Sequence, residues 1–63
     1  MTPAAYRSLA YAVGDLRDRA LILADLEGLD RLNAYRLLQL AAMAGEIVAS
    51  SELRVVEMEA VTP

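Results

Sequence analysis

Apolar residues recur at helical spacing along the first part of the chain. Between residues 6 and 23 they are separated alternately by three and four positions, which places them on one stripe of an α-helix. The members of this stripe are Tyr6, Leu9, Val13, Leu16, Ala20 and Leu23. Thr2 can cap the helix start with its side-chain oxygen, and Pro3 suits the first helical position. We therefore predict a first helix over residues 3–26.

A second apolar segment follows a short turn predicted at residues 27–30. Gly28 can adopt the left-handed conformation found after helices, and Asp30 can cap a following helix. The second helix is predicted over residues 31–50. Because the connection is short, the two helices should lie antiparallel as an all-α helical hairpin.

The predicted second helix carries more apolar surface than one neighbouring helix can cover. Its apolar residues form two adjacent stripes that together span about half of the helix circumference. Leu37, Leu40, Ala44 and Ile47 form the first stripe, and Ala34, Leu38, Ala41, Gly45 and Val48 form the second. If one stripe packs on the first helix, the other needs a second partner. We expect a homodimeric four-helix bundle, with the second stripe as the self-association interface.

Small residues occur in matching pairs on the two predicted helices. Ala41 and Gly45 are four residues apart on the second helix, as Ala10 and Gly14 are on the first. Such pairs allow two helix backbones to approach closely. They can close the hairpin or contact another subunit, and an alanine-rich helix with no special contact is a third interpretation.

The pattern changes over residues 51–63, which we expect to form a C-terminal arm. Val56, Met58 and Ala60 alternate with Glu57 and Glu59, as in a strand with one apolar face. A helical alternative continues one stripe through Ile47, Ser51, Val55 and Met58. Because paired serines continue a helix poorly, we favour a short extended or β segment.

Composition limits the ways in which this chain can gain stability. The 63 residues form one domain at most, and they include no cysteine and no histidine. Chains of this size bury only about 60% of the surface that the unfolded chain exposes, and their stability is marginal without disulfides, a metal or oligomerisation. Since this chain has no cysteine for a disulfide and neither cysteine nor histidine to bind a structural metal, oligomerisation or docking onto a partner remains.

The available side chains give little support to catalysis or to a cofactor. Nucleophilic catalysis needs a serine or cysteine beside a base, and the chain has no histidine, cysteine or lysine. Asp15 and Asp18 share a helix side with Arg17 and Arg19, which indicates a solvated charged face. We therefore expect no enzyme activity, no cofactor and no metal site.

Charge and hydropathy indicate the kind of partner to expect. The net charge of −3, with six arginines scattered among nine acids, disfavours a nucleic-acid partner. The longest uncharged stretch, 37–45, is too short to span a membrane, and we expect a cytoplasmic protein.

The sequence thus predicts a small protein–protein interaction module, such as a regulator, adaptor or inhibitor. Mixed aromatic, aliphatic and charged surface is typical of protein interfaces. The candidate partner surface consists of Arg7, Tyr11, Asp18, Leu21, Ile22, Val56 and Met58. Two alternatives stay open: a nucleic-acid-binding regulator built from a hairpin dimer, and a building block of a larger homomeric assembly that uses the arm for strand addition.

Overall fold

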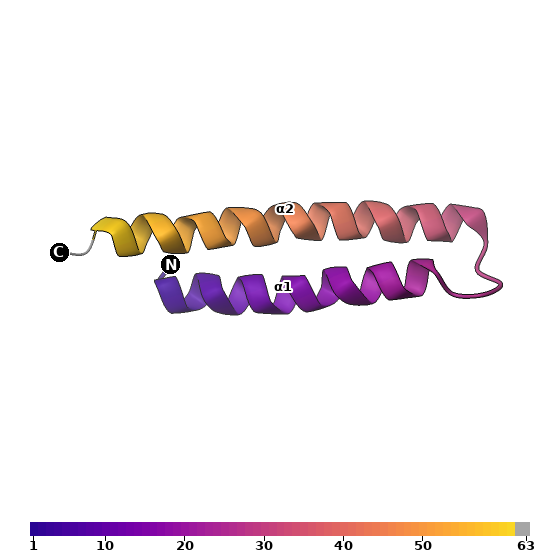
Figure 1. Cartoon of the computed structure of the whole chain (residues 1–63), viewed down its shortest axis with the longest axis horizontal. Helices are drawn as coiled ribbons and strands as arrows, with labels where there is room; N and C mark the ends of the chain where they lie inside the picture. The colour runs from indigo at the N-terminus through magenta and orange to yellow at the C-terminus, as the bar shows by residue number, and fades with distance from the viewer. Residues whose placement is uncertain (62–63) are drawn as a thin grey trace.

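The computed structural model describes residues 1–61 and consists of two antiparallel helices lying side by side (Figure 1). Helix α1 spans Pro3–Ala24 and helix α2 spans Arg31–Val61. They form a rod of 54 × 14 × 13 Å. The all-α helical hairpin predicted from the sequence is confirmed.

Both helix starts are held by the predicted capping residues. Thr2 accepts a hydrogen bond through its Oγ1 from the backbone N–H of Ala5, at 3.2 Å, and Pro3 occupies the first turn. Asp30 accepts a hydrogen bond from the backbone N–H of Asn33 at 2.9 Å and another from its side-chain amide at 2.8 Å. Each cap satisfies a backbone donor that the first turn of a helix leaves free.

The turn between the helices is longer than predicted. Helix α1 ends at Ala24, and the N–H of Asp25 then bonds to the carbonyl of Ile22 at 3.2 Å. Gly28 has a positive φ of 85°, which L side chains rarely adopt. The predicted glycine conformation is therefore present, within the loop and not directly at the helix end.

The C-terminal segment is helical, so the predicted extended arm is wrong for the residues that the structure describes. Helix α2 continues without interruption to Val61, whereas Thr62 and Pro63, the end of the predicted arm, lie outside the described residues. Ser51 stays within the helix by donating its hydroxyl to the carbonyl of Ile47 at 2.7 Å. This bond satisfies the buried hydroxyl, and helical propagation adds one backbone hydrogen bond per residue.

The contact between α1 and α2 follows a strict alternation of three- and four-residue steps, which we call the seam. The seam positions on α1 are Pro3, Tyr6, Ala10, Val13, Arg17, Ala20 and Ala24, and those on α2 are Ala34, Leu37, Ala41, Ala44, Val48, Ser51, Val55 and Met58. Every helical residue that is not exposed belongs to it, apart from Ala5, Gly14 and Gly45. This is the spacing of a two-helix coiled-coil contact.

The core inside the seam is made of small side chains. Its buried apolar members are Ala20, Ala41, Ala44 and Val48, and Ser51 is the buried polar residue. The two small pairs predicted from the sequence contribute to this contact: Gly14 and Ala41 are buried, and Ala10 and Gly45 are half-buried. The small pairs therefore lie along the hairpin contact.

The placement of the predicted self-association stripe has to be corrected. Ala34, Ala41 and Val48 lie in the seam against α1, and Gly45 borders it. Only Leu38 is exposed, at 50%. A second chain cannot reach the buried members of this stripe while the hairpin is folded, so only Leu38 of this stripe is accessible to one.

Candidate functional site

Large apolar side chains gather on one flank of the hairpin, which we call the leucine face. It consists of the large apolar residues that directly precede every second seam position: Leu9, Leu16 and Leu23 on α1, and Leu40 and Ile47 on α2, where Asn33 and Arg54 occupy the two ends of the same column. Their exposed fractions run from 37% to 47%. In an antiparallel helix pair these two columns lie on the same side of the contact. The face therefore continues across both helices.

The register of the hairpin sets which residues of the leucine face lie level with each other. A Cβ added at Gly14 would meet Val48 Cγ2 at 3.8 Å, and one added at Gly45 would meet Arg17 Cδ at 3.8 Å. These contacts place Leu16 level with Ile47. One heptad nearer the turn, Leu23 is level with Leu40. The face thus contains two adjacent apolar layers.

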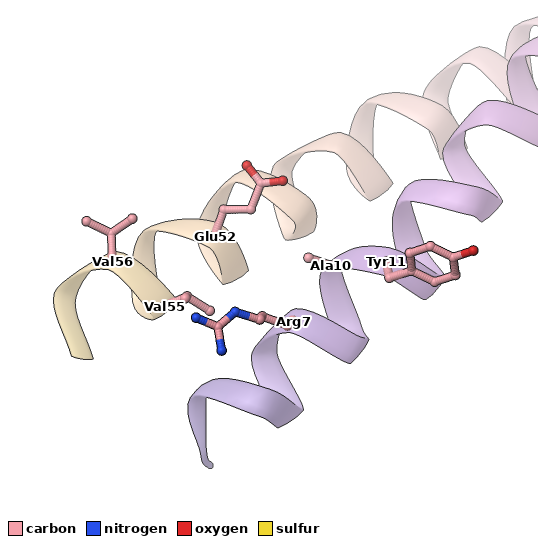
Figure 2. Close-up of a pocket in the computed structure, with 6 residues that line it drawn as sticks. All are labelled: Arg7, Ala10, Tyr11, Glu52, Val55 and Val56. Atoms are coloured by element: carbon pink, nitrogen blue, oxygen red, sulfur yellow. The ribbon is translucent and has the colours of Figure 1, made fainter. Parts of the chain in front are cut away.

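The opposite flank contains a shallow groove, which we call the tyrosine groove (Figure 2). It encloses about 410 Å³ and is lined by Arg7, Ala10, Tyr11, Glu52, Val55 and Val56. Figure 2 shows the Arg7 side chain and Val55 between the two helices, with Tyr11 at the α1 edge. The small side chain of Ala10 leaves the hollow between its larger neighbours. Tyr11 is 83% exposed and offers its ring to solvent.

A second hollow of about 350 Å³ continues the groove toward the turn. It shares Ala10, Tyr11 and Glu52 with the first hollow, and it adds Gly14, Asp15, Arg17, Asp18 and Val48. The Arg17 stem passes the two glycines, with its Nη2 3.9 Å from a Cβ added at Gly14. The glycines therefore provide the space that this long side chain occupies beside the seam.

Ion pairs hold most of the arginines around these surfaces. Arg7 of α1 pairs with Glu59 of α2 and joins the two helices. Within the helices, Arg19 Nε lies 3.0 Å from Asp15 Oδ2, Arg17 Nε lies 3.2 Å from Asp18 Oδ1, and Arg54 Nη1 lies 3.7 Å from Glu57 Oε2. Exposed pairs contribute little stability. They do reduce the free positive charge that a phosphate backbone would need.

The capping carboxylate of α2 is the site of a pKa shift. The backbone N–H of Asn33 lowers the pKa of Asp30 from its ordinary value of 3.8, and the Asn33 side-chain amide lowers it further. Both donors favour the ionised carboxylate. The shift reflects helix capping, because both donors belong to Asn33 in the first turn of α2. Asp30 lines neither hollow of the groove.

The structure brings together part of the predicted partner surface. Arg7, Tyr11 and Val56 line the tyrosine groove, and Asp18 lines its continuation. Leu21 and Ile22 are exposed on α1 but line neither hollow, and Met58 is half-buried in the seam. Sequence reasoning missed Glu52 and Val55 because residues 52–61 were expected to be extended. If the helix is continued through these residues, its heptad repeat places Glu52 and Val55 beside Arg7 and Ala10.

The described residues hold no group of three or more acidic, histidine or cysteine side chains arranged to bind a metal ion. Within residues 1–61, neither helix contains a stretch that is long and apolar enough to cross a membrane. Comparisons of the chain with protein families, with curated proteins and with solved structures find no match.

Proposed function

We propose that this chain is a non-enzymatic protein–protein interaction module whose hairpin completes its apolar core on a second helical surface. The observation that supports this proposal is the distribution of side-chain size. The buried positions hold glycine, alanine, serine and one valine, whereas the leucines and isoleucines remain partly or largely exposed. Full burial of a leucine or isoleucine side chain contributes about 1.5–3 kcal/mol. A hairpin that leaves these residues in water forgoes much of that stabilisation.

Self-association into a homodimeric four-helix bundle is the form of this function that the chain can achieve alone. The five residues of the leucine face are each nearly half exposed. Covering them would add about 3–6 kcal/mol per protomer at the usual value for leucine burial. The tyrosine groove lies on the other flank and stays open to a regulatory target or another protein partner.

The solution mass and the thermal unfolding of the chain, measured from about 1 µM to about 500 µM, test self-association. A dimer should have a melting temperature that rises with concentration, because association stabilises only the folded state. A folded monomer whose melting temperature is independent of concentration would contradict self-association.

The role of the groove needs a separate test. Proximity crosslinking in cells that express the chain should capture a protein that is lost on Tyr11→Ala and retained on Leu21→Ala, and the purified pair should then bind directly. Leu21 is a suitable control because it is exposed on α1 but lies outside the groove. Equal capture by both variants would contradict a binding role for the groove.

A further inference from the structure

We propose that the leucine face is the surface on which a second copy of this chain docks, with the two hairpins related by a two-fold axis in the plane of that face. This inference rests on the proposed function and specifies its partner and its surface. The leucine face comprises Leu9, Leu16, Leu23, Leu40 and Ile47, as defined above. The tyrosine groove would remain on the outside of both protomers.

The number of apolar columns on each helix points to a bundle. A helix that packs on one other helix needs two apolar positions per heptad, whereas a helix in a four-helix bundle needs a third apolar position beside these two. The seam supplies the first two columns in this hairpin, and the leucine face supplies the third on both helices. The third column is continuous through Leu9, Leu16 and Leu23 on α1.

The exposed apolar area is of the size that a specific interface uses. Leu26 and Met43 border the face and are 53% and 62% exposed. With them, the patch leaves on the order of 500 Å² of apolar surface in water, at the upper end for a monomer. A standard interface covers about 800 Å² per partner, including its polar rim. Arg19 and Arg36 are exposed in the helix columns next to the face, four residues before Leu23 and Leu40, and would supply part of that rim.

A second copy matches the face because its central layers are equally uncharged. The layer that contains Leu16 and Ile47 and the layer that contains Leu23 and Leu40 carry no charged residue. A two-fold axis along the helices would place each layer against its own copy, so that four apolar side chains meet at each level. Helices related in this way are antiparallel to all their neighbours, as in an up-and-down bundle. A charged partner surface would leave its ionic groups desolvated against these layers.

Two leucine-to-alanine variants on the same helix provide the test. Leu16 and Leu21 are each 46% exposed, but they lie on opposite flanks of α1. Alanine retains full helix propensity, so both variants keep the helix itself intact. The dissociation constant of the dimer would be measured by sedimentation equilibrium for the wild type, Leu16→Ala and Leu21→Ala. We expect Leu16→Ala to raise this constant by about tenfold to a hundredfold and Leu21→Ala by less than about threefold.

Other outcomes separate failure of this inference from failure of self-association. If Leu21→Ala weakens the dimer and Leu16→Ala does not, the hairpins associate through the groove flank; the inference fails and self-association stands. Equal effects, or no effect of either variant, would also overturn the leucine face as the specific contact. A wild-type chain that stays monomeric over the whole range would overturn both.

Discussion

Replacing the two seam-flanking glycines with alanine should stabilise the protein. Gly14 and Gly45 lie inside helices, where glycine is about 0.5–1 kcal/mol less favourable than alanine. The new Cβ atoms would meet their nearest neighbours at 3.8 Å, which is ordinary van der Waals contact. The gain in helix propensity is therefore not offset by a clash. We expect about 1 kcal/mol from each substitution and about 2 kcal/mol from the double variant.

Thermal and urea unfolding followed by far-UV circular dichroism would measure this gain at a fixed protein concentration. For a domain of this size, 1 kcal/mol corresponds to about 4–8 °C in melting temperature. Because Gly14 and Gly45 lie away from the leucine face, the dimer dissociation constant should not change. Gly28→Ala is the control: its surroundings are open, but its φ of 85° is unfavourable for alanine. That variant should lose about 1 kcal/mol.

A loss of stability in Gly14→Ala or Gly45→Ala would refute this reasoning. It would mean that the helix backbones approach each other more closely at these positions than the 3.8 Å contacts indicate. Glycine would then be required for the contact itself and not merely tolerated there. A gain in Gly28→Ala would separately contradict the left-handed conformation of the loop.

Three further predictions concern the caps and the seam. The lowered pKa of Asp30 in the folded protein means that the unfolded chain binds a proton at this carboxylate more readily. The contribution of Asp30 to stability is therefore complete well above pH 3.8 and is lost as the pH falls through the lower folded pKa. Asp30→Ala should flatten this part of a plot of melting temperature against pH, and an unchanged plot would contradict the capping role. Ala41→Asp should abolish the helical circular dichroism signal, because it places a carboxylate at a position only 5% exposed; a folded monomer would contradict the seam assignment. Ser51→Ala should change the unfolding free energy by less than about 1 kcal/mol, because its hydroxyl bonds only to the Ile47 carbonyl of its own helix; a larger loss in urea unfolding would indicate a second partner for that hydroxyl.

The helix starts and the hairpin topology could be predicted because their causes are local. Thr2 and Asp30 cap through side chains that reach a backbone N–H three residues away, so a short stretch of sequence contains the whole interaction. The short connection then restricts the helices to an antiparallel arrangement. No knowledge of distant contacts was needed.

The faces of the helices could not be predicted because periodicity does not distinguish adjacent columns. On α1, Leu9 and Leu16 share a helical stripe with Val13 and Ala20, yet only the latter two belong to the seam. Hydrophobicity alone favours the leucines for the contact, yet the buried part of the seam holds mostly small residues. The helical structure of the end of α2 could not be predicted for a related reason. Its valines and alternating glutamates are also typical of a strand, and the sequence does not show that Val55 packs in the seam against α1.

The division of side-chain size between the seam and the leucine face is the reason why we expect the stability of the fold to depend on a second surface. If the leucines occupied the seam and the alanines lay outside, the hairpin would bury its largest apolar groups by itself. In this chain the seam includes a single leucine, Leu37, and the largest buried side chain among the described residues is Val48. The small side chains buried in the seam permit close backbone approach but remove little apolar area from water. If the leucine face is covered as we propose, it supplies the burial that the seam lacks, and the folding of the hairpin is then coupled to that contact.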